Sequence, residues 1–177
     1  NGNNTRWDKK DLKNYKGKIY TYNEKSFFVN TNGNISRAMG WQGSYFIDND
    51  GCVKYYDDGT TSFRITKNGG TKALKDGWND DVYVKNGKIQ RSTIVKSGGC
   101  NYFVDKNGSR QNFKVKNNQI VRPDNSMAVS SGIYVAAGKK YPVDNKGKIQ
   151  KNSTVVIKNK AYETVSDGSL SKQPANH

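Results

Sequence analysis

Short groups of hydrophobic residues alternate along the chain with turn-forming steps, most of which read Asn-Gly or Asp-Gly. The glycines of these steps stand at positions 33, 51, 69 and 87, each 18 residues from the last, and then at 108, 147 and 168. A period near 20 residues is typical of an array of small repeated units rather than of one large core. The chain is therefore predicted to be a repeat protein.

The residues around these glycines predict β-hairpins. Six of the seven glycines have an aromatic residue six positions earlier, and the exception is Asp81. The positions four before and two after the glycine are mostly apolar. They share one face only if the loop has three residues and ends in a left-handed glycine, as in a type I turn with a glycine bulge. The pattern thus predicts an all-β fold of hairpins, about 18–21 residues each, with one buried face.

The period also divides the chain into segments. The hairpin array is expected over residues 18–118 and 139–170. Residues 119–138 fit the period least and are interpreted as a degenerate repeat or a junction. Residues 1–17 are predicted to form an N-terminal cap or linker, and residues 171–177 a disordered tail.

Residues 40–51, which read GWQGSYFIDNDG, resemble the cell-wall-binding and glucan-binding repeats of Gram-positive surface proteins. Residues 76–87 and 101–108 are weaker copies. Choline-binding repeats, the glucan-binding ends of glucansucrases and the repetitive ends of large clostridial toxins are related modules. The resemblance covers residues 18–170. It implies that the hairpins stack into a β-solenoid and that ligands, usually sugars or choline, bind between neighbouring units.

The aromatic residues depart from the choline-binding type. A choline cage needs several aromatic rings around the quaternary ammonium. Only Trp41 and Trp78 lie within repeats, and neither is followed by the Trp-Tyr-Tyr of that type. The sequence therefore favours a ligand other than choline.

The charge points to the kind of ligand. The chain has 30 Lys and Arg against 15 Asp and Glu, a net charge of +15. Such a field attracts polyanions, so an anionic cell-wall polymer or polysaccharide is the predicted partner. Lysines interleaved with aromatics, as at Lys54-Tyr55-Tyr56, could also bind single-stranded nucleic acid, but no nucleic-acid motif is present and this partner ranks third.

Candidate ligand-binding residues come from the repeat aromatics and nearby polar side chains. Trp41 and Trp78 are interpreted as stacking platforms for sugar rings or as residues that fill the gap between hairpins. Adjacent strand residues point to opposite faces, so only one of Tyr45 and Phe46 can be core. The candidates are Trp41, Gln42, Tyr45, Phe46, Trp78, Tyr83, Lys85, Lys88, Tyr102 and Phe103.

Cys52 and Cys100 are the only cysteines. A small even number in a secreted protein suggests a disulfide, and the three units per solenoid turn that the resemblance implies would stack these two residues. The alternatives are two buried free thiols or one exposed thiol. Two cysteines and the single His177 do not make a metal site, and no cofactor is expected.

Catalysis finds little support in the residue types. The one histidine is terminal, which leaves no Ser–His or Cys–His pair. Glu24 and Glu163 are the only glutamates. The chain is predicted not to be an enzyme, although its parent protein could be one.

The predicted function is a non-catalytic module that attaches a larger secreted protein to bacterial wall polymers, teichoic acid or another glycan. No apolar run approaches the roughly 18 residues of a membrane span, and the start at Asn1-Gly2 is interpreted as that of an excised piece. The expected location is therefore secreted, at the bacterial cell surface. A host-glycan-binding adhesin or toxin-type receptor-binding region, a neutral glucan-binding module of a glucansucrase, and a spacer without ligand are the alternatives. The oligomeric state stays open.

Overall fold

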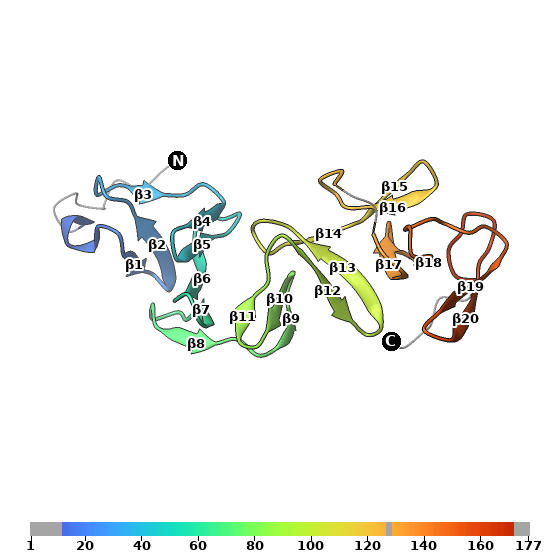
Figure 1. The fold of residues 1–177 in the computed structure, drawn as a ribbon. Helices are drawn as coiled ribbons and strands as arrows, with labels where there is room; N and C mark the ends of the chain where they lie inside the picture. The colour runs from blue at the N-terminus through green and yellow to red at the C-terminus, as the bar shows by residue number, and fades with distance from the viewer. Residues whose placement is uncertain (1–11, 127–128, 172–177) are drawn as a thin grey trace. The chain divides into compact units, whose positions relative to one another are not determined.

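Short strands joined by tight turns make up the described chain (Figure 1). The computed structural model describes residues 12–126 and 129–171, so residues 1–11 of the predicted cap or linker 1–17 and residues 172–177 of the predicted tail 171–177 lie outside the described residues. The 3₁₀ helix η2 (Lys13–Tyr15) precedes the first strand, and almost all strand pairs are antiparallel. The predicted all-β class is confirmed. No helix within the described ranges is long and apolar enough to cross a membrane.

The chain divides into two compact units, residues 1–79 with 84–89 and residues 80–83 with 90–177. The strands of the first unit are β1 (Ile19–Tyr22), β2 (Lys25–Val29), β3 (Ile35–Ser36), β4 (Gly40–Gln42), β5 (Tyr45–Ile47), β6 (Val53–Asp57), β7 (Ser62–Ile65), β8 (Thr71–Ala73), β9 (Gly77–Asn79) and β11 (Lys88–Ile89). The strand β10 (Val82–Lys85) has residues in both units. The strands of the second unit are β12 (Thr93–Ser97), β13 (Cys100–Val104), β14 (Arg110–Gln111), β15 (Lys114–Lys116), β16 (Gln119–Val121), β17 (Gly132–Ala136), β18 (Lys139–Val143), β19 (Thr154–Ile157) and β20 (Lys160–Glu163).

Six of the seven repeat glycines close the predicted three-residue loop. At the first of them, the Gly33 N–H donates to the Asn30 carbonyl at 3.0 Å, and Val29 pairs directly with Ile35. The glycine has a φ of +82°, which only glycine adopts without strain. The same backbone bonds recur at the glycines 51, 69, 108, 147 and 168.

A carboxylate or amide oxygen locks four of these loops. The Oδ1 atom of Asn30 accepts hydrogen bonds from the backbone N–H groups two and four residues later, at 2.9 and 3.0 Å. Asp48, Asp105 and Asp144 make the same pair of bonds in their loops. The first loop residue is therefore as much a part of the repeat as the glycine.

The prediction of a three-residue loop is wrong at Gly87. Lys85 pairs directly with Lys88, so Asn86 and Gly87 form a two-residue turn. Both have positive φ, +54° and +77°, as a type I′ turn requires. The register is shifted by one residue relative to the other repeats, which is why this repeat has Asp81 where the others have an aromatic residue.

A second set of reversals, which the glycine period did not reveal, closes the longer hairpins. These two-residue turns have positive φ at both positions. They are Asn23-Glu24, Gly98-Gly99, Asn117-Asn118, Ala137-Gly138 and Lys158-Asn159. Each repeat of this kind therefore reverses direction twice, once at a two-residue turn and once at a three-residue loop.

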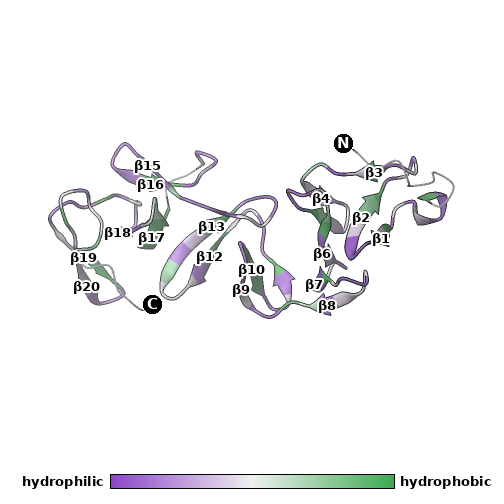
Figure 2. Cartoon of the chain, turned by 180° about the vertical axis from the view of Figure 1, so that it is seen from behind, coloured by the Kyte–Doolittle hydropathy of each residue, from purple (hydrophilic) through white to green (hydrophobic). Residues whose placement is uncertain are grey.

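The predicted buried face is confirmed. The position four residues before the loop glycine is fully buried, at 0% exposure, in Val29, Ile47, Val104 and Val143. In Figure 2 the hydrophobic colour lies mainly on the strands, several of which also carry the hydrophilic colour. Since each hairpin buries only a few side chains, the core is built from many small contacts between neighbouring hairpins.

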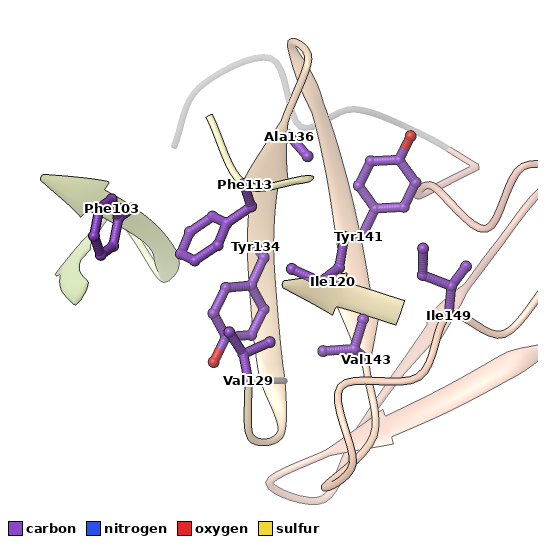
Figure 3. Packing of buried hydrophobic residues seen from close by; sticks show 9 residues of the cluster. All are labelled: Phe103, Phe113, Ile120, Val129, Tyr134, Ala136, Tyr141, Val143 and Ile149. Carbon is purple, nitrogen blue, oxygen red and sulfur yellow. The ribbon is translucent and has the colours of Figure 1, made fainter. Parts of the chain in front are cut away.

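The second unit has a cluster of buried side chains around β16, β17 and β18 (Figure 3). The Phe113 ring lies edge-on to Tyr134, with centroids 4.9 Å apart, and 6.2 Å from the ring of Phe103. Ile120 and Val143 are fully buried beside them. The strands β16 and β17 lie in the stretch 119–138, which the sequence period fitted least, and contribute Ile120 and Tyr134 to this core.

An ion pair in the second unit gives a pH prediction. The Lys139 ammonium donates to Asp167 Oδ2 at 2.6 Å and holds the pKa of that carboxyl well below its usual range. Because the carboxyl has a lower pKa in the folded state than in the unfolded state, its ionisation stabilises the fold at any pH above the unfolded-state pKa of about 3.9. This stabilisation is lost as the pH falls from that pKa toward the pKa of the folded state. Asp167→Asn is therefore expected to lower the Tm by a few degrees at neutral pH, and the difference should shrink below pH 4 in calorimetric scans.

Glu24→Gln is the control for this prediction. It removes the carboxylate of a more exposed pair, in which Glu24 lies 3.8 Å from Lys67. Surface pairs of this kind contribute little to stability, so this variant should melt with the wild type. A Tm difference for Asp167→Asn that stays constant down to strongly acidic pH would contradict the role given to the ion pair.

Candidate functional site

A row of aromatic side chains crosses the five-stranded sheet of the first unit. Tyr45 of β5 pairs directly with Tyr56 of β6, and Tyr56 pairs with Phe63 of β7. Their ring centroids are 5.0 and 6.0 Å apart, and Phe28 of β2 lies 5.7 Å from Tyr45. We call Phe28, Tyr45, Tyr56 and Phe63 the aromatic row. Gln42 of β4 pairs with Tyr45 at one end of it.

The aromatic row lies on the accessible face of the five-stranded sheet, and the opposite face of this sheet is buried in the core. All four rings are half-buried. On the other face, Phe46 packs against Trp41 and Tyr55, with centroids 5.5 and 5.9 Å apart. Phe46 is 6% exposed. The prediction that only one of Tyr45 and Phe46 is core is confirmed.

None of the four side chains of the row carries a charge. Burial raises the pKa of the Tyr45 hydroxyl, and the neighbouring Tyr56 raises it further. The phenol of Tyr45 thus stays protonated at physiological pH and can donate a hydrogen bond. Half-exposed rings beside hydroxyl and amide groups suit a ligand that has both apolar faces and hydroxyls, such as a sugar ring.

A hollow of about 530 Å³ lies in the second unit between β12, β13, β17 and the β19–β20 hairpin. Lys96, Lys158 and Lys160 line it, and so do Ile133 and Tyr162. We call it the lysine groove. A neighbouring hollow of about 450 Å³ shares Ile133, Lys160 and Tyr162 with it.

Sequence reasoning missed the lysine groove because its lining comes from strands some 60 residues apart. Only the excess of lysine pointed toward it. The aromatic row was found in part: Gln42 and Tyr45 were predicted, whereas Phe63 was seen only as a repeat aromatic and Tyr56 only beside Lys54, and Phe28 was not singled out. The pairing of β5 with β6 and β7 is what brings these together.

The other predicted residues are spread over the two units. Trp78 and Tyr83 are half-buried, and the Tyr83 hydroxyl donates to the Lys96 carbonyl at 3.3 Å. Lys85 is exposed. The Lys88 ammonium interacts with other residues of the first unit, since it donates a hydrogen bond to the Gly59 carbonyl at 2.9 Å and lies 3.9 Å from Asp57.

The second predicted aromatic pair behaves like the first. Phe103 is 6% exposed and belongs to the buried cluster (Figure 3). Tyr102 is half-buried, and the Arg110 guanidinium lies 5.5 Å from its ring centroid. Thus Phe46 and Phe103 are core residues, and the tyrosines before them are the accessible members.

The predicted disulfide does not form in this structure. Cys52 and Cys100 are both free thiols, half-buried and buried respectively. Cys52 belongs to the first compact unit and Cys100 to the second. The prediction depended on the regular count of three repeats per solenoid turn that the sequence resemblance implies. Across residues 12–126 and 129–171, no three His, Cys, Asp or Glu side chains are grouped so as to hold a metal ion.

The fold and these surfaces define an all-β hairpin-repeat module. Among solved structures, the chain is similar to the choline-binding domain of CbpL from Streptococcus pneumoniae, with 19% identity and a TM-score of 0.33 over 90% of this chain and 99% of that one. It is also similar to the modular autolysin LytC from Streptococcus pneumoniae, with 13% identity and a TM-score of 0.25 over 89% of this chain. This chain spans only 42% of the LytC chain.

A third similar structure is an alternansucrase in complex with isomaltononaose, with 16% identity and a TM-score of 0.23 over 87% of this chain and 16% of that one. No family model and no curated protein matches the sequence. With TM-scores of 0.33 and below, the chains superimpose only in part, so function has to be derived from this chain's own residues.

Proposed function

We propose that this chain is a non-catalytic binding module that attaches a larger secreted protein to a wall polymer of the bacterial surface, teichoic acid or another glycan. The aromatic row is the observation that carries this proposal. It presents the half-buried rings of Tyr45, Tyr56 and Phe63 on the accessible face of a sheet whose other face is core, with Phe28 of the neighbouring β1–β2–β3 sheet and the Gln42 amide next to Tyr45. Core packing accounts for the buried face of this sheet, but it does not require aromatic rings on the accessible face.

The charge of the chain supports a polymer rather than a small neutral ligand. A net charge of +15 speeds the encounter with polyanions and adds affinity at low salt. Rings supply sequence-tolerant stacking along a repeating ligand, and lysines supply attraction to its charges. The proposal also includes the stacking of the hairpins into a β-solenoid, which the sequence resemblance implies and which would repeat such surfaces along the array.

The test is co-sedimentation of the chain with purified Gram-positive cell walls, before and after removal of teichoic acid, at low and high salt. Tyr56→Ala is expected to weaken binding roughly tenfold, because loss of one stacking ring costs about 1–3 kcal/mol. Tyr56 lies in the middle of the row, between Tyr45 and Phe63, so its removal interrupts the surface.

Tyr22→Ala is the matched control, since Tyr22 is a tyrosine of the same unit that is 51% exposed and lies outside the row. It should bind walls like the wild type, and circular dichroism should show both variants folded. Binding lost on removal of teichoic acid would identify that polymer, and binding that survives would identify peptidoglycan or a neutral glycan. Binding to host mucin but to no wall preparation, or equal binding by Tyr56→Ala and wild type, would overturn the proposal.

A further inference from the structure

The lysine groove brings together polar side chains from three hairpins of the second unit. Lys96 of β12 and Asn101 of β13 are direct cross-strand partners, and both line it. Lys160 comes from β20 and Lys158 from the turn before it. The hydroxyl residues Ser130 and Ser131 complete the polar lining. The groove therefore converges from segments that are remote in sequence.

The charge of this lining is entirely positive. Three lysines line the hollow, and within the part of the chain that the structure describes no Asp or Glu does. Lys96 and Lys158 line the same hollow, and the interaction with Lys158 lowers the pKa of Lys96. Two like charges at close range repel each other, and an anion bound between them would remove this repulsion.

The floor of the groove shows which kind of anion fits. Ile94, Ile133 and Ile157 provide apolar surface, and Tyr162 is half-buried. The other ring, that of Tyr134, is 3% exposed and its hydroxyl is bonded to the Ser130 carbonyl at 2.9 Å. Nucleic acids need several exposed rings for their bases. A polymer of phosphates joined by polyol or sugar units needs only cations, hydroxyl partners and some apolar contact.

We propose that the lysine groove binds the phosphodiester groups of a polyol-phosphate or sugar-phosphate polymer, at a site separate from the aromatic row. This inference rests on the proposed function in placing the polymer on the bacterial wall, but it names a different surface and a different chemistry. Lys96 and Lys158 hold one phosphate between them. Asn101 and the serine hydroxyls bond to the polyol or sugar.

The experiment measures binding of poly(glycerol phosphate) to the full chain by titration calorimetry over a series of salt concentrations. The double variant Lys96→Gln with Lys158→Gln is expected to bind about tenfold more weakly, and its affinity should depend less steeply on salt because fewer counterions are released. Both side chains are exposed, so the fold should persist.

Lys114→Gln with Lys116→Gln is the matched control. These two exposed lysines of β15 lie in the same unit and outside the groove, and their replacement removes the same charge. The fold-loss of affinity of this control variant should be less than a third of the fold-loss of the groove variant. Equal losses of affinity in the two double variants would show that the polymer responds to the overall positive charge of the chain, and would overturn the site. Tighter binding of single-stranded DNA than of poly(glycerol phosphate) would overturn it as well.

Failure of this inference differs from failure of the proposed function. Tyr56→Ala should bind poly(glycerol phosphate) like the wild type, because this probe has no sugar ring for the aromatic row. The chain could bind no wall preparation while the groove variant still binds poly(glycerol phosphate) more weakly than the Lys114/Lys116 control does. In that case the proposed function fails and the lysine groove stands as a phosphate-binding site. If wall binding depends on Tyr56 and the two lysine variants behave alike, the groove fails and the proposed function stands.

Discussion

Ile120→Ala is expected to lower the free energy of unfolding of the second unit by about 2–5 kcal/mol, the usual cost of removing most of a buried isoleucine side chain. Ile120 is fully buried in the cluster of the second unit (Figure 3). Each hairpin contributes few core residues, so neighbouring side chains have little apolar material with which to refill the cavity. In a protein of ordinary stability, a loss of this size is a large fraction of the total.

Urea unfolding followed by circular dichroism measures this effect. Val115→Ala is the control, because Val115 lies directly opposite Ile120 in the β15–β16 hairpin and is 53% exposed. Its replacement should change stability by no more than about 0.5 kcal/mol. If the two variants were equally stable, the assignment of Ile120 to the core of the second unit would be wrong.

The second large effect is expected for Gly147→Ala. It should lower the free energy of unfolding by at least twice as much as alanine does at a glycine that has the same φ but open space around its Cα. Gly147 has a φ of +74°, and a Cβ there would lie 2.6 Å from the Val129 carbonyl oxygen. The left-handed conformation alone costs about 1–2 kcal/mol for a side chain. Since the obstructing atom is backbone, the clash is relieved only by moving a chain segment.

Gly138→Ala separates strain from contact. Gly138 has nearly the same φ, +75°, but a Cβ there would meet no atom within 4 Å beyond its chain neighbours. It should therefore show the conformational cost alone, measured by urea unfolding in parallel with Gly147→Ala. Equal destabilisation of the two variants would mean that the close approach between Gly147 and Val129 contributes nothing to stability.

The glycine period predicted the loops well because their geometry is local. A loop such as 30–34 is determined by a left-handed glycine and an Asx side chain that bonds to the backbone two and four residues on. Both requirements are visible in the sequence. The register between Val29 and Ile35 follows from the number of loop residues alone, and so does the shared buried face.

The remaining features depend on pairing between segments, which single-sequence patterns do not encode. The turns Asn117-Asn118 and Lys158-Asn159 contain no glycine and therefore lay outside the glycine period. The aromatic row required the register of β5, β6 and β7 to be known, because a slip of one residue would have moved Tyr56 to the core face. The lysine groove is lined by residues from β12, β19 and β20 together, and local sequence gives no sign that these strands share a hollow.

The three-residue loops also bear on how such a chain can change length. Each loop sets the phase of its two strands within five residues, through bonds that involve no other repeat, as at Asp105 and Asp144. A recombination event that joins two copies of this loop would delete or duplicate whole repeats while every remaining strand keeps its inward and outward faces. Genes for such arrays are thus free to gain and lose repeats in whole-number steps.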